Sequence, residues 1–548
     1  MSGPEPSAGL EGLAACEGPT VPEGPTVLVE PTAPTEDGKR VRIVLMPGNN
    51  ALIDARVMKN LRTAAALGYD AIALGLSRGE AVEEHLFDWG GRVIIQPVPL
   101  RYEAWRRYRR WRISFDRTDR SIGRAYAAYL RQDRDFENGR AVRDGGRAGT
   151  ATPAERPSSV TKMWRRLRYL AVRVLVKARS LSADREIRRD AWEPAKLEAW
   201  RRRRFAWLKL APWRTHWRKA VPKAVDDAMA VAGQLDQLAP DIVHVHDVYM
   251  MHAAAQYAIR AARRGEAVRL IYDAREFVPG LAHVPPRRVA AYAALEREFM
   301  PDFDRVVSVS VPMATAVAER HGLIRRPDVV MNAPMEDLEA TDVPSVRQAA
   351  GVGEDVPLLV YSGGVNPARG VGTIVRALAR LPRAHLAVVV NNRGTAVVHL
   401  EELAGELGLA DRLHLVPFVP HDQVTRYLGS ADVGLSPLSR VANHDLTVTN
   451  KFCEYIEAGL PIVTSDTPAQ AELVRELGLG EVFVADDAAS LASAVNRVLD
   501  NLDSLKTRIV NDQALRFRFS WAAQAEVLAG VYAEETAVLG LPVPPARS

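Results

Sequence analysis

The stretch from Asn450 to Asp466, NKFCEYIEAGLPIVTSD, has the pattern of a helix that ends and passes into a buried strand. Apolar residues recur at helical spacing: Phe452, Ile456 and Leu460. Gly459 stands where the end of a helix favours a residue with positive φ, and Pro461 prevents the helix from resuming. Residues 462–464, Ile-Val-Thr, are all β-branched and predict a short strand. The stretch therefore predicts an α/β fold.

The same helix carries two charged residues, Lys451 and Glu454. They lie three positions apart, so they share one face of the helix. An ammonium and a carboxylate near the start of a helix could hold a phosphate and a ribose diol. An ordinary surface ion pair has the same spacing, and spacing alone leaves both interpretations open.

A second signal precedes this helix in the chain. Residues 357–362 predict a strand, Gly363-Gly364 follow as a loop, and a helix begins at Arg369-Gly370. Glycines let the backbone approach a phosphate closely, and a helix N-terminus beside a cation favours an anion. The pattern predicts an anion-binding loop.

The first half of the chain shows the same rhythm of strand and helix. Residues 41–46 predict a buried strand, residues 54–67 a helix, and residues 71–74 a second strand. This order predicts a parallel sheet. Gly48 lies in the loop after the first strand, where it is either a plain turn or part of a ligand-binding loop.

Two further strands end in polar residues. His246 and Asp247 close the strand at 241–247, and Arg275 and Glu276 follow the strand at 269–273. Ligands bind at the carboxyl ends of strands in open α/β sheets, so these four residues are candidates for a substrate site. The alternative for His246 is a hydrogen-bonded core histidine. Arg275 is expected to pair with Glu276 or to face a phosphate.

Bulk properties indicate a globular protein of two or three domains, because 548 residues exceed one core. The two cysteines, Cys16 and Cys453, form no disulfide framework and have no metal-ligand spacing. Residues 1–38 hold seven prolines and are expected to be disordered. We expect no signal peptide and no membrane-spanning helix, and hence a cytoplasmic location.

The charge is distributed unevenly. Residues 101–220 hold 34 lysines and arginines against 13 aspartates and glutamates, a net of +21, while the whole chain carries +5. Eight of the ten tryptophans fall in the same stretch. Basic amphipathic helices are expected within 160–220, in a helical insertion spanning 101–222. They either contact an anionic membrane, peripherally at its inner face, or pack on the domain with solvated arginines. Nucleic-acid binding is not indicated, because no recognition motif accompanies the charge.

The segment from Lys451 to Pro461 resembles the donor-site helix of GT-B glycosyltransferases of the retaining group 4, the glycosyl transferases group 1 type. The resemblance implies that Glu454 binds the ribose of a nucleotide sugar. A second glutamate is usual at the position of Leu446, whereas Asn450-Lys451 resembles an Asn/Lys variant of the motif.

Other segments resemble the same family. The resemblance implies that Arg369 takes the place of a phosphate-binding lysine, while Gly364 stands where an arginine is usual. Arg275 replaces a histidine of the first domain. The resemblance covers about 40–100 and 240–533, and the basic stretch lies outside it.

The implied architecture has two Rossmann-like, doubly wound domains that face a cleft. The chain is expected to begin with a disordered tail (1–38) and an N-terminal acceptor domain (39–335) that contains the basic insertion (101–222). A C-terminal donor domain (336–515) follows, and then a helix that returns to the N-terminal domain (516–548). In this arrangement Gly363, Gly364, Asn450 and Gly48 lie on the donor side.

The implied activity transfers a sugar from a nucleotide-sugar donor, with retention at the anomeric carbon. The resemblance further implies no cofactor and no bound metal. The basic stretch suggests a lipid-linked or anionic acceptor, as in cell-envelope polysaccharide or glycolipid assembly. Two alternatives stay open. One is a nucleotide-sugar epimerase on the same fold, and the other is a non-catalytic partner subunit.

Overall fold

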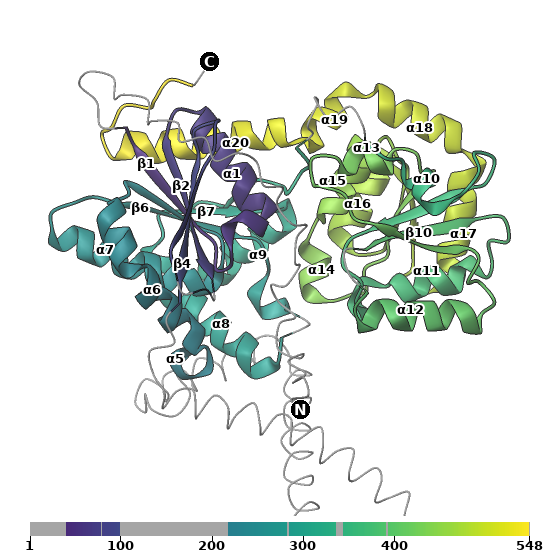
Figure 1. Ribbon diagram of the computed structural model, residues 1–548, viewed down its shortest axis with the longest axis horizontal. Helices are drawn as coiled ribbons and strands as arrows, with labels where there is room; N and C mark the ends of the chain where they lie inside the picture. The colour runs from purple at the N-terminus through teal and green to yellow at the C-terminus, as the bar shows by residue number, and fades with distance from the viewer. Residues whose placement is uncertain are drawn as a thin grey trace, which may run out of the picture. The chain divides into compact units, whose positions relative to one another are not determined.

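The structure is a computed structural model that describes residues 40–98 and 217–546, apart from 78, 80, 282–283, 336–342 and 391–392. The predicted tail, nearly all of the basic insertion and most of the linker between the domains lie outside these residues. Within them, two separate β-sheets are each flanked by helices, as Figure 1 shows.

The first sheet has eight strands in the order β3-β4-β2-β1-β5-β6-β7-β8. Seven are parallel, and only β3 runs antiparallel, against β4. The register places Val44 beside Ile72 on one side and beside Val243 on the other. The strands are β1 (Arg42–Met46), β2 (Asp70–Ser77), β3 (Glu83–Leu86), β4 (Arg92–Pro97), β5 (Ile242–Val245), β6 (Arg269–Ala274), β7 (Arg305–Ser308) and β8 (Asp328–Val329).

Both faces of this sheet are buried, because successive residues of a strand point to opposite faces. Val44 and Met46 belong to one hydrophobic cluster, whereas Ile43 and Leu45 belong to another. The helices of this domain are α1 (Ala55–Ala66), α5 (Trp217–Ala220), α6 (Pro222–Leu238), α7 (Met251–Arg263), α8 (Pro286–Phe299) and α9 (Val311–His321). The cluster of Val44 includes residues of α6, α7 and α8, and that of Ile43 includes residues of α1.

The second sheet has six parallel strands in the order β11-β10-β9-β12-β13-β14. Alternation again buries both faces, since Val360 and Tyr361 lie in different clusters. The strands are β9 (Leu358–Ser362), β10 (His385–Val390), β11 (Leu413–Pro417), β12 (Val433–Ser436), β13 (Ile462–Ser465) and β14 (Gly480–Phe483). Its helices are α10 (Val346–Ala350), α11 (Val371–Leu378), α12 (Thr395–Glu406), α13 (Val424–Leu428), α14 (Ala442–Leu446), α15 (Asn450–Glu457), α16 (Pro468–Leu477), α17 (Ala488–Asp500), α18 (Leu502–Asn511) and α19 (Gln513–Phe519).

The helix–turn–strand predicted from the sequence at 450–466 is confirmed by α15 and β13. Gly459 has a φ of 72°, as a helix C-terminus of this kind requires. The amide of Leu460 donates to the carbonyl of Tyr455 at 2.8 Å and closes the turn. A side chain at Gly459 would also meet Val510 at 2.7 Å, so conformation and packing both favour glycine.

The last helix, α20 (Trp521–Val538), packs on the first domain. The indole nitrogen of Trp521 donates to the hydroxyl of Thr63 at 3.0 Å. The hydroxyl of Tyr532 and Nδ1 of His244 share a hydrogen bond of 2.9 Å. These contacts fasten the end of the described chain to α1 and β5.

Several elements differ from the sequence predictions. Helices α18 and α19, which follow the end of α17 at Asp500, were not predicted. The antiparallel pair β3–β4 was also not predicted. The end of the expected insertion is part of the first domain's core, because Trp217 is buried and its ring nitrogen donates to Glu298 at 2.6 Å.

The two α/β domains confirm the fold class predicted from the sequence. Among the residues that the structure describes, no helix combines the length and the apolar character needed to cross a lipid bilayer.

Candidate functional site

The loop after β9 brings its backbone close to a cation. Gly363 has a φ of 128°, a conformation that residues with a side chain rarely adopt. A Cβ atom there would lie 3.2 Å from the ammonium nitrogen of Lys451. Gly363 and Gly364 are both exposed. Gly363, one of the two glycines predicted to let a ligand approach the backbone, thus lies directly beside the predicted phosphate-binding lysine.

Lys451 is a buried cation at the start of α15. Its side chain is only 5% exposed, and its ammonium lies 4.9 Å from the centroid of the Tyr361 ring. It makes no hydrogen bond or ion pair within the described part of the chain. Burial and, to a smaller extent, the nearby Arg369 together lower its pKa to about 7. A buried charge without a counter-ion is costly, so the site favours an anion.

Arg369 supplies the second cation. It ends the short helix η5 (Pro367–Arg369), where the side chain of Asn366 accepts a hydrogen bond from its amide at 3.1 Å. Gly370 follows with a φ of 69°, and a Cβ there would come within 1.7 Å of the carbonyl oxygen of Pro437. The guanidinium of Arg369 has no ion pair among residues 40–98 and 217–546 that the structure describes. Its charge is therefore also available to an anion.

Glu454 lies one helical turn after Lys451 and is half-buried. Burial raises the pKa of its carboxyl group, and Lys451 acts against that shift. The two groups make no ion pair within 4 Å, so the ordinary surface pair that the spacing also allowed is not formed. Asn450, the first residue of α15, is exposed beside them. Leu446, at the position of the usual second glutamate, ends α14 and is half-buried.

Tyr455 fixes the helix that carries these residues. Its hydroxyl accepts from the amide of Ser362 at 3.1 Å and lies 3.2 Å from the carbonyl of Leu435. Its ring occupies the space above Gly434, where a Cβ atom would approach ring carbon at 2.4 Å. Helix α15 is thereby held against the ends of β9 and β12.

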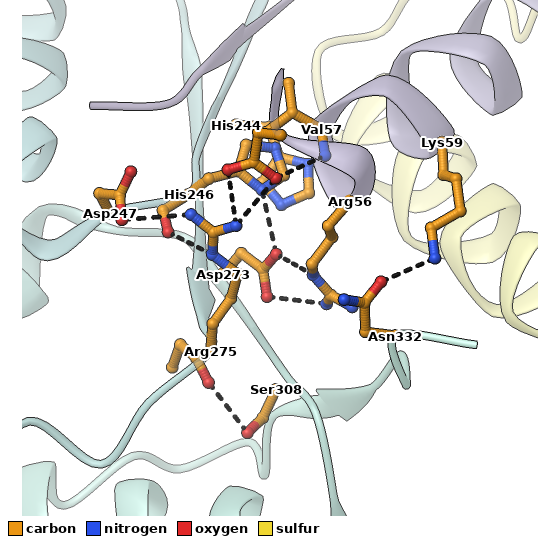
Figure 2. A network of polar contacts seen from close by, with 12 residues as sticks. Arg56, Val57, Lys59, His244, His246, Asp247, Asp273, Arg275, Ser308 and Asn332 are labelled. Carbon is orange, nitrogen blue, oxygen red and sulfur yellow. Dashed lines mark hydrogen bonds and ion pairs between the residues drawn. The ribbon is translucent and has the colours of Figure 1, made fainter. Parts of the chain in front are cut away.

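A second polar cluster lies in the first domain, at the carboxyl ends of its strands. Figure 2 shows Arg56 and His246 converging on Asp273. Arg56 donates to both carboxylate oxygens of Asp273, at 2.6 and 2.9 Å, and Nδ1 of His246 lies 3.0 Å from one of them. All three side chains are buried. Although burial raises the pKa of Asp273, Arg56 and His246 hold it well below its usual range.

Arg275 ties two loops together, as Figure 2 also shows. It donates to both oxygens of Asp54 at 3.2 and 2.9 Å, to Asp247 at 3.1 Å and to the carbonyl of His246 at 2.9 Å. The expected pairing with Glu276 is replaced by these bonds, and Glu276 is exposed. Every nitrogen of the Arg275 guanidinium already has an acceptor, so this residue holds the acidic loops in place.

Gly48 is built into the same arrangement. Its amide donates to Asp247 at 2.7 Å, and its carbonyl accepts from Lys223 at 2.9 Å. A Cβ atom at Gly48 would overlap the ring of Tyr249 at 1.8 Å. Glycine is therefore required here for packing, and its amide is already engaged by a side chain.

One group of potential metal ligands occurs among the described residues: His244, His246 and Asp273. Both oxygens of Asp273 already bind the guanidinium of Arg56. A metal ion would have to share this carboxylate with an adjacent positive charge. The cluster is thus better described as a neutralised ion-pair network.

Two contributors were not singled out from the sequence as functional residues. Arg56 and Lys59 lie on α1, where charged residues usually face solvent. A signal was present, since polar residues recur at helical spacing on a face that is otherwise apolar: Arg56, Asn60 and Thr63. The ammonium of Lys59 donates to Asn332 at 2.7 Å and lies 4.7 Å from the Trp521 ring.

Two stretches of the sequence match known protein families. The family described as "Glycosyl transferases group 1" matches residues 342–513, and that described as "Glycosyl transferase 4-like domain" matches residues 152–334. The second match begins inside the basic stretch, which the resemblance found in the sequence did not include.

Two curated relatives carry the name D-inositol 3-phosphate glycosyltransferase. The protein from Nocardia farcinica is 25% identical over 248 residues, which are 43% of this chain and 54% of the relative. The protein from Xylanimonas cellulosilytica is 26% identical over 314 residues, 56% of this chain and 70% of the relative. The chain thus matches little more than half of the first relative's length and about two thirds of the second's.

Solved structures share the fold at low sequence identity. Sucrose-phosphate synthase from Thermosynechococcus elongatus has a TM-score of 0.57 at 15% identity and covers 91% of this chain and 100% of its own. A trehalose-6-phosphate synthase, OtsA, has a TM-score of 0.54 at 14% identity and covers 92% and 100%.

Two parallel-sheet α/β domains with these neighbours define a protein of the GT-B fold. The two family matches together span more than half of the sequence. The chain is thus similar to glycosyltransferases in both of its domains, to the group 1 family over residues 342–513 and to the 4-like domain over residues 152–334.

Proposed function

We propose that this protein transfers a sugar from a nucleotide-sugar donor to an acceptor, with retention at the anomeric carbon. The observation that carries the proposal is the buried ammonium of Lys451, which has no counter-ion among the described residues and lies beside the exposed Gly363 backbone. A site that holds positive charge ready in this way suits a ligand that brings negative charge, such as a diphosphate.

In the proposed donor site, each charged or glycine residue has a separate role. Lys451 and Arg369 neutralise the diphosphate, and their charge stabilises it further as it leaves the sugar. Glu454 accepts hydrogen bonds from the ribose hydroxyls. Gly363 and Gly364 let the phosphates approach the backbone, with Asn450 at the edge of the site.

The same charges support transfer without a metal ion. Divalent cations in related chemistry hold and neutralise transferring or leaving phosphates. Here Lys451 and Arg369 supply two positive charges close together, and after burial the charge of Arg369 is the next cause that lowers the pKa of Lys451. We propose that neither a metal nor another cofactor is required. Full activity in the presence of EDTA is expected, and loss of activity restored by Mg²⁺ would contradict this.

The acceptor side is assigned to the first domain. His246, Asp247 and Glu276 lie at or just beyond the ends of β5 and β6, and Arg275 fixes their loops. The acceptor that we propose is anionic or lipid-linked. Its support is the net charge of +21 over residues 101–220 and the inositol phosphate in the names of the two curated relatives.

A role in envelope polysaccharide or glycolipid assembly, at the inner face of the plasma membrane, would follow from peripheral membrane binding. Deleting residues 160–220 is a poor test, because Trp217 is part of the core of the first domain. Replacing Arg201, Arg202, Arg203 and Arg204 by glutamine removes charge without removing chain. We expect weaker sedimentation with anionic phosphatidylglycerol vesicles and no change with neutral vesicles. Equal binding of both proteins to anionic vesicles would contradict a membrane role for these arginines.

The donor proposal is tested by thermal shift against UDP-, GDP- and ADP-sugars. A ligand at one hundred times its Kd stabilises the protein by about 2.7 kcal/mol, which gives a clear shift. NMR of the donor incubated with the protein alone distinguishes an epimerase, which yields an isomer. NMR of a glycosylated product shows whether the anomeric configuration is retained. A protein that binds a donor but transfers no sugar to any acceptor tried would support the non-catalytic alternative.

A further inference from the structure

Thr449 stands at the N-cap of the donor-site helix α15 but does not cap it. Its backbone has the extended conformation typical of an N-cap residue, with φ −81° and ψ 156°. Threonine at this position normally accepts a hydrogen bond from an amide of the first turn. Here the hydroxyl instead donates to the side-chain oxygen of Gln470, at 2.9 Å.

Gln470 is placed to hold this hydroxyl. It lies on α16, and its side chain is fully buried. Its oxygen also accepts from the hydroxyl of Ser436 at 3.1 Å, and its nitrogen donates to the hydroxyl of Thr467 at 3.4 Å. A buried amide with its partners on both ends is held in one orientation, because each lost hydrogen bond would leave a buried polar atom unsatisfied.

The diverted hydroxyl leaves the start of α15 open. The amides of Asn450 and Lys451 lie in the first turn, where a helix offers no carbonyl to accept from them. Neither has an acceptor among the residues that the structure describes. The buried and unpaired ammonium of Lys451 belongs to the same turn. Amides and ammonium together form the surface that would meet a phosphate oxygen.

We propose that Gln470 is a positioning residue for donor binding: by holding the Thr449 hydroxyl away, it keeps the first-turn amides of α15 free for a phosphate of the nucleotide. This inference rests on the proposed function. Gln470 acts on the helix amides that would meet the phosphate, and the proposal gives it no role toward the base or the ribose. Gln470 therefore influences affinity for a nucleoside diphosphate and not for the nucleoside alone.

The test measures Kd by calorimetry for UDP, GDP and ADP, and continues with the tightest and its nucleoside. In Gln470→Leu the hydroxyl of Thr449 is released to cap the helix. We expect the Kd of the diphosphate to rise about fivefold, the value of a typical N-cap hydrogen bond, while the Kd of the nucleoside is unchanged. In Gln470→Leu/Thr449→Val no hydroxyl is left to cap, and we expect the Kd to return to within about twofold of wild type.

Two single variants provide matched controls at the helix start. Thr449→Val removes the hydroxyl and is expected to bind the diphosphate within about twofold of wild type. Thr449→Asn places a strong N-cap residue there and is expected to weaken the diphosphate about fivefold with Gln470 intact. Comparing these two variants tests whether a capped α15 binds the diphosphate more weakly, even when Gln470→Leu does not fold.

The outcomes separate the two proposals. If wild type binds none of the three diphosphates, the proposed function fails and the role of Gln470 fails with it. If wild type binds but Gln470→Leu and Thr449→Asn bind equally well, only the role of Gln470 is overturned. Gln470→Leu could also bind the diphosphate more weakly without rescue by the added Thr449→Val change, or could weaken the nucleoside to the same degree. Either result would show a packing effect and would also overturn the role of Gln470.

Discussion

The ammonium of Lys451 lies 4.9 Å from the centroid of the Tyr361 ring and forms no ion pair with any described residue. The aromatic face offers partial compensation for a cation. It does not replace the lost hydration of a side chain that is only 5% exposed. A positive charge is thus held in the free protein at a cost that a bound phosphate would offset.

The first prediction concerns stability without ligand. Lys451→Met removes a buried, unpaired charge, so we expect the free energy of unfolding to rise by about 1–2 kcal/mol. Urea denaturation followed by circular dichroism measures it. Lys506→Met is the matched control, because Lys506 pairs with Asp432 at 3.1 Å and its loss should destabilise by about 1 kcal/mol. Destabilisation by both changes would show that the Lys451 ammonium is not under strain.

The second prediction concerns proton uptake by Lys451 when a nucleoside diphosphate binds. Burial and Arg369 lower the pKa of Lys451 to about 7 in the free protein. An unfolded lysine titrates near 10.4, so between these values the unfolded state binds more protons, and the cost of burying Lys451 falls as the pH rises. A bound phosphate should restore the charge. At pH 8 we expect nucleoside diphosphate binding to take up close to about one proton.

Calorimetry in buffers of different ionisation enthalpy measures that uptake. The uptake should fall at pH 6, where Lys451 is already charged, and should vanish in Lys451→Met. Binding at pH 8 with no proton uptake would show that the phosphate does not meet this ammonium.

The third prediction concerns Arg275, which holds Asp54 and Asp247. Arg275→Gln leaves two largely buried carboxylates without their cation, so we expect the free energy of unfolding to fall by about 2–4 kcal/mol. Arg497→Gln is the control, because Arg497 and Glu481 form an exposed pair and the change should cost less than about 1 kcal/mol. Urea denaturation compares them, and equal costs would contradict a bracing role for Arg275.

The fourth prediction concerns two glycines of the second domain. Gly370→Ala places a Cβ atom 1.7 Å from the carbonyl oxygen of Pro437 at a φ of 69°, so a loss of about 1–3 kcal/mol is expected. Gly405 lies inside α12 with open space around it, and Gly405→Ala should stabilise by about 0.5–1 kcal/mol. Thermal unfolding reports both signs. A neutral Gly370→Ala would mean that the loop before α11 can shift.

Local patterns predicted the fold well. The turn at Gly459 and the strand at 462–465 followed from spacing and residue type alone, because a helix C-terminus and a β-branched run are decided locally. The exposed strand β3 and helices α18 and α19 were missed, since they carry weak or amphipathic patterns that fit loops as well as helices.

The candidate site was only partly predictable. Lys451 and Glu454 were named from one helix, because both lie within a single turn. The partners of Arg275 were not, since Asp54 lies 221 residues away in the chain and nothing local prefers it over the adjacent Glu276. Arg56 was overlooked as a site residue for the same reason, because its partner Asp273 is 217 residues distant. Long-range charge pairing is determined by which strand ends meet in the sheet.

The central claim is that Lys451, Arg369 and Glu454 bind a nucleotide sugar. The most direct measurement is equilibrium binding of UDP, GDP and ADP, with the matching nucleosides, to wild type, Lys451→Met, Arg369→Met and Glu454→Gln. We predict that one diphosphate binds wild type, that the two cation variants lose the diphosphate but keep the nucleoside, and that Glu454→Gln weakens both. Failure of wild type to bind any of the three, or binding unaffected by all three substitutions, would contradict the account.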